Sequence, residues 1–273
     1  MHRSNHRVLC TIAGFDPTGG AGVGVDLAVF EAFGAVGKAV VTVETEQDEG
    51  GVRRLGARDP HVVAEELRAV LDDDDPAGIK IGALGTRALA EAVAEVLGDG
   101  NDRWVVLDPV LSASAGGHLL EPNAVAHLVG ILGSVVDVVT PNAPEADVLL
   151  GDTPLPLDLF QPRALAKAFA LCNQGWSAAL LKGGHSPNGQ RLEDVLADGS
   201  GVSTFERIVL DGPDVRGTGC ALSSAIAGYL AQGASLWTAC HRAGDWVHAL
   251  IAEAHAAGRP TLNPSAVALP GAD

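Results

Sequence analysis

Short runs of apolar, β-branched residues alternate along the chain with longer stretches in which apolar residues recur every three or four positions. The short runs predict strands, and several are apolar at consecutive positions, as strands buried on both faces of a parallel sheet should be. The longer stretches predict amphipathic helices, and this alternation is typical of βαβ units. The predicted strands cover residues 8–13, 39–46, 78–83, 104–108, 135–140 and 178–182. The predicted helices between them cover residues 21–33, 60–71, 87–97, 122–132 and 163–172.

The last third of the chain carries a different pattern. Residues 193–196 and 205–209 predict two short strands around a turn at Asp198-Gly199-Ser200-Gly201, which indicates a small antiparallel edge. Two long stretches, residues 218–232 and 236–257, predict the helices that close the chain. Ser235 is the N-cap candidate for the second of them.

The whole pattern predicts a doubly wound α/β fold, with a mostly parallel central sheet and helices on both of its faces. The sequence has no internal repeat and no linker that would divide it. We therefore expect a single domain over residues 1–273, with its core at about residues 8–257. In such sheets the ligand binds beyond the carboxyl ends of the strands, so the residues that follow each strand are the candidates for chemistry.

Composition narrows the classes of function. The chain has 273 residues and a formal net charge of −16. An acidic surface repels phosphate backbones, and an aromatic content of 4% leaves few rings for base stacking, so we expect no nucleic-acid partner. The four cysteines form no C-x-x-C pair, and no apolar run reaches the ~18–20 residues needed to cross a bilayer. We expect a cytoplasmic protein with no membrane partner.

Two segments carry residues that can bind phosphate, one at the start of a predicted helix and one at the end of a predicted strand. Arg216-Gly217-Thr218-Gly219-Cys220 opens a long helix of small residues, and the free N–H groups of such a turn bind anions. Lys182 follows a predicted strand and precedes two glycines, in a chain with only four lysines, and its ammonium group can hold a phosphate oxygen. Alone, the first pattern also fits a tightly packed helix start, and the second fits a solvated surface lysine.

Oxygen-bearing side chains follow two neighbouring strands. Asp108 ends one predicted strand, and Asn142 and Glu145 follow the next. This set suits Mg²⁺, which takes few protein ligands and keeps several waters. Asn142 is equally a helix N-cap with Glu145 at its N3 position, and the two roles are compatible. Asp26 falls within an apolar helical face, where an unpaired carboxylate is costly, so we expect it to bind a partner.

Seven blocks follow one another in a distinctive order: Ile12-Ala13-Gly14-Phe15-Asp16, Gly19-Gly20-Ala21-Gly22 with Asp26, Lys80-Ile81-Gly82, Asp108-Pro109-Val110, Thr140-Pro141-Asn142-Ala143-Pro144-Glu145, Lys182-Gly183-Gly184-His185 and Gly217-Thr218-Gly219-Cys220. In this order they resemble the hydroxymethylpyrimidine kinase and phosphomethylpyrimidine kinase family, which has the ribokinase-like fold. The resemblance covers about residues 8–257, nearly the whole chain.

The resemblance implies transfer of the γ-phosphoryl group of ATP to the hydroxymethyl group of 4-amino-5-hydroxymethyl-2-methylpyrimidine, and then to its monophosphate, in thiamine biosynthesis. It also implies ATP and Mg²⁺ as cofactors and a homodimer as the assembly. By position, it assigns the pyrimidine site to Gly14, Ala21, Asp26, Gln47, Ala83 and Val110. It assigns ATP binding to Lys182, Thr218, Asn142 and Arg216, and the magnesium environment to Asp108 and Glu145. It assigns catalysis to Lys182, Gly217, Thr218, Gly219 and Cys220.

Cys220 stands where many sugar kinases of this fold carry an aspartate base and where pyrimidine kinases carry cysteine. A thiol at a helix N-terminus should have a pKa below its reference value of about 8.5. Cys220 would then accept the proton of the alcohol, or only orient the hydroxyl group. A buried, inert cysteine is the remaining alternative.

Several positions depart from the family pattern. Ala83 stands where a methionine is common, which enlarges the pocket unless Phe15 fills the space. Arg216 replaces a frequent histidine, Asp48-Glu49 replaces Asn-Thr, and Ser114-Ala115-Gly116 has no lysine where the family usually carries one. Two other functions therefore stay open. One is a kinase for pyridoxal, pyridoxine or another heteroaromatic alcohol, and the other is a binding module that has lost phosphoryl transfer.

Overall fold

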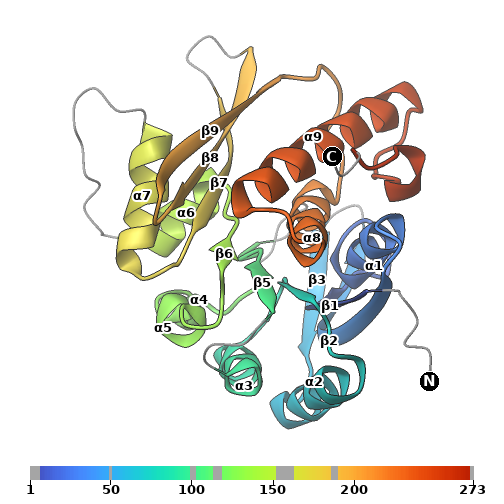
Figure 1. Cartoon of the computed structure of the whole chain (residues 1–273). Helices are drawn as coiled ribbons and strands as arrows, with labels where there is room; N and C mark the ends of the chain where they lie inside the picture. The colour runs from blue at the N-terminus through green and yellow to red at the C-terminus, as the bar shows by residue number, and fades with distance from the viewer. Residues whose placement is uncertain are drawn as a thin grey trace.

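The computed structural model describes residues 7–48, 51–98, 103–112, 119–151, 163–185 and 190–270, and within these it leaves out the side chains of residues 46–48, 51–54, 122–123 and 184–185. The described residues form a nine-stranded sheet in the order β3-β2-β1-β4-β5-β6-β7-β8-β9 (Figure 1). The strands are β1 (Val8–Phe15), β2 (Val36–Asp48), β3 (Gly51–Ala57), β4 (Gly78–Ile81), β5 (Trp104–Leu107), β6 (Val138–Val139), β7 (Ala179–His185), β8 (Arg191–Asp198) and β9 (Gly201–Ile208).

The sheet is parallel in its centre and antiparallel at both ends. Strands β2, β1, β4, β5, β6 and β7 run parallel. At one end β3 pairs antiparallel with β2, and at the other β8 and β9 continue antiparallel from β7. The predicted fold class, a mostly parallel sheet with a small antiparallel edge in the last third, is confirmed.

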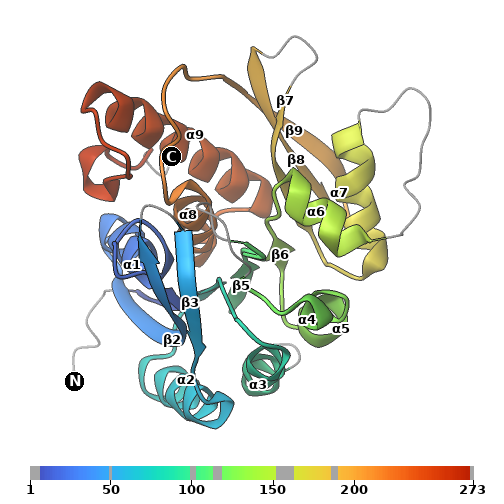
Figure 2. The ribbon, with the colours of Figure 1, turned by 180° about the vertical axis from the view of Figure 1, so that it is seen from behind.

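Helices form a layer on each face of the sheet (Figures 1 and 2). One apolar cluster packs under α1 (Gly22–Ala32), α8 (Thr218–Ala231) and α9 (Leu236–Ala256), which the short 3₁₀ turn η1 (Pro264–Ala266) follows. The other packs under α2 (Pro60–Asp74), α3 (Arg87–Leu97), α4 (Pro122–Val125), α5 (Leu128–Leu132), α6 (Ala143–Leu150) and α7 (Arg163–Gln174). This is the arrangement of a doubly wound α/β fold.

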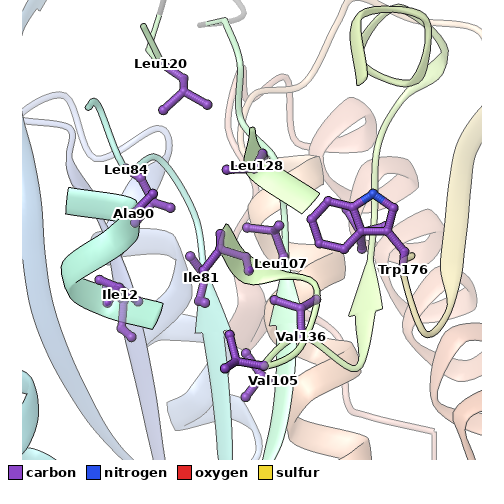
Figure 3. Packing of buried hydrophobic residues seen from close by; sticks show 14 of the residues in the cluster. Ile12, Ile81, Leu84, Ala90, Val105, Leu107, Leu120, Leu128, Val136 and Trp176 are labelled. Carbon is purple, nitrogen blue, oxygen red and sulfur yellow. The ribbon is translucent and has the colours of Figure 1, made fainter. Parts of the chain in front are cut away.

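Neighbouring residues of one strand belong to opposite layers, because side chains alternate along a strand. Leu107 contributes to the cluster under α2–α7, together with Ile12 and Ile81 from the neighbouring strands (Figure 3). Val106, one residue earlier, contributes to the cluster under α1, α8 and α9. Both faces of the central strands are therefore buried, which explains their nearly continuous apolar sequence.

Some predicted elements differ from those of the structure. The segment 51–57 was not predicted as a strand, because its glycines and adjacent arginines lack the alternation of a half-buried strand; it forms β3 by pairing with an extended β2. The helix predicted over residues 122–132 is broken into α4 and α5, and the strand predicted at 135–140 shortens to β6. Asn142 begins a helix, α6, and Ser235 caps α9 as predicted.

In the part of the chain that the structure describes, no helix combines the length and the apolar character needed to span a membrane.

Candidate active site

A cavity of about 970 Å³ opens where the parallel strands end. Its walls come from the loop after β1, the ends of β5 and β7, the start of α6, and the turn that begins α8. This is the edge at which doubly wound sheets bind ligands. The predicted site residues on its wall are Gly14, Ala21, Ala83, Asp108, Val110, Asn142, Glu145, Lys182, Arg216, Gly217, Thr218, Gly219 and Cys220.

Lys182 and Asp108 form an ion pair at the centre of this wall. The Nζ atom of Lys182 lies 2.8 Å from Oδ1 of Asp108, and the side chains are 14% and 5% exposed. Lys182 is anchored by its backbone N–H, which donates to the carbonyl of Pro141 at 2.8 Å. Burial alone would lower the pKa of Lys182, but the charges of Asp108 and Glu145 outweigh it and raise the pKa. The ammonium group therefore stays charged at neutral pH.

Glu145 lies beside this pair and is tied to the start of α6. Its Oε2 accepts the backbone N–H of Asn142 at 2.9 Å, and the backbone N–H of Glu145 donates to Oδ1 of Asn142 at 2.9 Å. These two bonds form a capping box, so the cap role expected for Asn142 is confirmed. Burial raises the pKa of Glu145, an effect that Lys182 opposes and Asp108 reinforces.

The turn before α8 brings backbone donors to the same place. Gly217 is the N-cap of α8 and has no side chain. No N-cap side chain therefore accepts a hydrogen bond from the first backbone N–H groups of the helix. A Cβ atom on Gly219 would lie 3.3 Å from Oδ2 of Asp108 and 3.4 Å from Nζ of Lys182. The glycine thus lets the helix terminus approach the ion pair, and the N–H groups and Lys182 converge on one anion-binding region.

Cys220 is on the cavity wall, but its thiol is not activated in the way the sequence suggested. Burial raises the pKa of the Cys220 thiol to about 11. Lys80 opposes that shift, Asp26 and Asp108 reinforce it, and the backbone N–H of Gly22 donates to the sulfur. The expectation of a lowered pKa was therefore wrong, because loss of solvent and two nearby carboxylates outweigh Lys80 and the N–H of Gly22.

Asp26 is the second residue that the structure positions differently. It is fully buried and is absent from the cavity wall. Its carboxylate accepts two bonds from Nζ of Lys80, at 2.8 and 2.9 Å, and one each from the hydroxyls of Thr11 and Ser224, at 2.6 and 2.9 Å. The expected partner of Asp26 is therefore internal. Direct contact of Asp26 with a pyrimidine is not supported, because Lys80, its ion-pair partner, lines the cavity and Asp26 does not.

Arg216 faces the loop after β1. Its guanidinium group donates to Oδ2 of Asp16 at 3.1 Å and to the hydroxyl of Thr18 at 3.2 Å. Phe15 lines the cavity, as Ala83 does, and remains 45% exposed. The side chain of Gln47 and the segment Ser114-Ala115-Gly116 lie outside the described residues.

The cavity extends beyond the predicted residues, toward α9. There it is lined by Leu210, Val247, Ile251 and His255, with His255 donating from Nε2 to the carbonyl of Pro213 at 2.9 Å. Sequence reasoning missed this part. The available signal was the spacing of Val247, Ile251 and His255, which places them on one face of a helix.

Comparisons with known proteins relate the chain to one family of kinases. Residues 16–264 match the model of the family described as phosphomethylpyrimidine kinase. A hydroxymethylpyrimidine/phosphomethylpyrimidine kinase of Aquifex aeolicus is 35% identical over 252 residues, which are 92% of this chain and 97% of the relative.

Solved structures resemble the chain over a similar span. A phosphomethylpyrimidine kinase from Clostridium difficile superposes with a TM-score of 0.74 at 29% identity, over 90% of this chain and 99% of that one. A pyridoxal kinase from Staphylococcus aureus, solved in complex with ADP, superposes with a TM-score of 0.79 at 26% identity, over 91% of this chain and 89% of that one.

Proposed function

Because this chain belongs to the phosphomethylpyrimidine kinase family and is a phosphotransferase, we propose that it transfers the γ-phosphoryl group of ATP to 4-amino-5-hydroxymethyl-2-methylpyrimidine, to its monophosphate, or to both. The observation that carries the proposal is the convergence of Lys182, Asp108 and the first turn of α8 on one wall of the cavity. Phosphoryl transfer needs mainly positioning and stabilisation of charge, which these groups can supply.

In this proposal the cavity has two ends with different chemistry. The apolar region beside Val247 and Ile251 suits a nucleobase, and the end lined by Gly14, Ala21, Ala83 and Val110 suits the pyrimidine, with Gln47 as the expected partner of its amino edge. Between them, Lys182 and the N–H groups of Gly217, Thr218 and Gly219 face the transferring phosphoryl group. Asn142 and Arg216 are the further contacts expected for ATP.

The donor set fits Mg²⁺ delivered with the nucleotide. Asp108 and Glu145 supply carboxylate oxygens, and the described residues contain no group of three or more acidic, histidine or cysteine side chains that could hold a metal alone. Mg²⁺ is usually bound through one or two carboxylates together with substrate phosphates and water. When bound, it would neutralise phosphate charge; Asp108 and Glu145 are the residues that would hold it.

A pyridoxal-type substrate is the second candidate. It is favoured by the superposition on the pyridoxal kinase and by the small Ala83 side chain at the pyrimidine end. A larger pocket admits a different ring, and substrate preference is a difference between kcat/KM values.

A coupled ADP-release assay tests the proposal with four alcohols in parallel: hydroxymethylpyrimidine, its monophosphate, pyridoxal and pyridoxine. We expect kcat/KM for at least one of the pyrimidines to exceed the values for both pyridines by about 100-fold, an order reasonable for a shaped polar site. Preference for a pyridine would transfer the assignment to vitamin B6 chemistry. ADP release with none of the four, combined with ligand binding, would favour a binding module.

Replacement of Cys220 by alanine should lower kcat about tenfold and change the Kd of the pyrimidine less than about twofold. The pKa of about 11 keeps the thiol protonated at neutral pH, so we propose that it orients the substrate hydroxyl through one hydrogen bond. One such bond is worth about 1–1.5 kcal/mol, which corresponds to a factor of about five to ten in rate. Steady-state kinetics and calorimetry separate the two effects. Serine should restore most of the rate; a loss above about 1000-fold, unrestored by serine, would instead identify a catalytic base.

The thiamine pathway and the homodimer remain predictions from the family resemblance, and the cytoplasmic location remains a prediction from the composition of the sequence. Analytical ultracentrifugation of the purified chain tests the dimer directly, because a monomer at micromolar concentration would contradict it.

A further inference from the structure

Lys182 lies in an irregular part of β7. The antiparallel register between β7 and β8 pairs Leu181 with Val195 and resumes with Gly184 and Glu193. Two residues, Lys182 and Gly183, therefore lie opposite one residue of β8, which is Asp194. This is the arrangement of a β-bulge, which locally redirects the side chains of the longer strand. Gly183 has a φ of +71°, which most other residues rarely adopt.

Asp194 replaces the hydrogen bond that the bulge removes from the ladder. Its Oδ1 accepts the backbone N–H of Gly183 at 2.8 Å. A side chain of β8 thus holds the backbone immediately after Lys182, on the opposite side from the carbonyl of Pro141, which accepts the Lys182 N–H. The two contacts together fix the segment from which the Lys182 ammonium reaches Asp108.

Asp194 is held in turn by Arg207 of β9. The Nη1 atom of Arg207 lies 2.8 Å from Oδ2 of Asp194, and the two side chains are only 9% and 16% exposed. The other nitrogens of Arg207 reach α9, where Nε contacts Oδ1 of Asp245 at 3.0 Å and Nη2 donates to the carbonyl of His241 at 3.0 Å. The guanidinium group therefore ties the bulge to a long helix across two strands.

We propose that Asp194 and Arg207 are positioning residues for phosphoryl transfer, which keep Lys182 aimed at the phosphate. Neither side chain lines the cavity, so neither contacts the nucleotide. The inference rests on the proposed function of Lys182. The position of the Lys182 side chain then depends on the largely buried ion pair of Asp194 and Arg207, which lies on the β8 side of β7.

A matched control is available on the same hairpin. Glu206 of β9 pairs with Arg191 of β8, so this ion pair joins the same two strands, but both side chains are at least half exposed. In the register of the hairpin, Glu206 lies opposite Glu193 and Arg191 lies opposite Ile208, so this pair is separate from the ion pair of Asp194 and Arg207. Glu206→Gln therefore removes a β8–β9 ion pair and leaves the support of the bulge in place.

The experiment compares Asp194→Ala, Asp194→Asn and Glu206→Gln by steady-state kinetics and by calorimetry with a non-hydrolysable ATP analogue. For Asp194→Ala we expect the KM for ATP to rise about tenfold and kcat to fall about tenfold, because small displacements of a charge-stabilising group cost one or two orders of magnitude. The KM of the alcohol substrate should change less than about twofold. Asparagine keeps an acceptor for Gly183 and should recover part of the loss, and Glu206→Gln should match the wild type.

A double-mutant cycle distinguishes positioning from a general loss of structure. In a Lys182→Ala background, Asp194→Ala should add no further loss of affinity for the ATP analogue, since the group that it positions is gone. Full additivity, an unchanged KM for ATP, or an equal rise in the KM of the alcohol would overturn the inference. If Asp194→Ala does not fold, Arg207→Lys is measured in the same way.

Failure of the proposed function gives a different result. If Lys182→Ala alone leaves the affinity for the ATP analogue and kcat at wild-type values, the phosphate assignment is wrong, and the inference built on it is also overturned. If Lys182→Ala loses kcat and affinity for the ATP analogue but Asp194→Ala and Arg207→Lys keep both, only the positioning role is excluded.

Discussion

Replacement of Lys182 by alanine should lower kcat for phosphoryl transfer about 1000-fold and raise the KM for ATP. The ammonium group is one of the charges that face the phosphoryl site, and it is held there by Asp108 at 2.8 Å. Removal of one preorganised group that stabilises developing charge typically costs 100- to 1000-fold in rate, or about 3–4 kcal/mol. Here the loss is expected at the upper end, because the substitution also leaves Asp108 buried as an unpaired anion next to the incoming phosphates.

Lys167 is the matched control for this prediction. It is also a largely buried lysine, 8% exposed, paired with Asp147 at 2.6 Å, but it lies on α7 and does not line the cavity. Lys167→Ala should leave kcat and the KM for ATP within about twofold of the wild type. Coupled ADP release gives both constants, and Lys182→Met repeats the test with the side-chain volume largely retained. Wild-type constants for either Lys182 variant would refute the assignment of this lysine to phosphate.

Replacement of Lys80 by methionine should lower the free energy of unfolding by about 3–5 kcal/mol, because it leaves a buried carboxylate without its cation. Lys80 and Asp26 are both fully buried, and the pair is completed by the hydroxyls of Thr11 and Ser224. Burial would lower the pKa of Lys80, but Asp26 outweighs it and the net shift is upward. A raised pKa keeps this contribution complete below the unfolded pKa of lysine, so the ion pair of the wild type contributes fully at both pH 6 and pH 8.

Urea unfolding measures this effect, with Lys38→Met as the control. Lys38 pairs with Asp74 at a comparable distance, 2.9 Å, but its side chain is 36% exposed. A surface pair of this kind contributes less than about 1 kcal/mol. The double variant with Lys80→Met and Asp26→Asn should regain part of the loss, since it removes the unpaired charge. A loss below about 1 kcal/mol for Lys80→Met alone would mean that Asp26 is neutral or solvated in the native protein.

The parts of the fold that were predictable are those whose signal is local. Strand β5 is short and apolar at consecutive positions, and α3 begins at Arg87 and ends at Leu97, as its periodicity predicts. The segment 51–57 carries no such signal, because β3 exists through its pairing with β2, which is a tertiary property. Likewise, β6 keeps two of the six residues predicted, since Val138 and Val139 pair with β5 and only Val139 also pairs with β7.

The candidate site was likewise predictable only in part. The order of the motifs brought Lys182, Asp108, Glu145 and Cys220 to one edge of a sheet, and the structure places all four on the cavity wall. What the sequence could not indicate is which charge pairs with which. The pKa of Cys220 was mispredicted because the dominant influence is burial beside carboxylates, and these come from other parts of the chain.

Among the described residues, three lysine and arginine side chains are on the cavity wall, and each has an aspartate partner: Lys80 has Asp26, Lys182 has Asp108, and Arg216 has Asp16. An incoming polyanion therefore meets ion pairs that are already neutralised, in a protein whose net charge is −16. Long-range electrostatic steering, which depends on an uncompensated field, contributes little to nucleotide capture here. We expect binding to depend instead on exchange at short range, in which phosphate oxygens replace carboxylates on cations that are already in position.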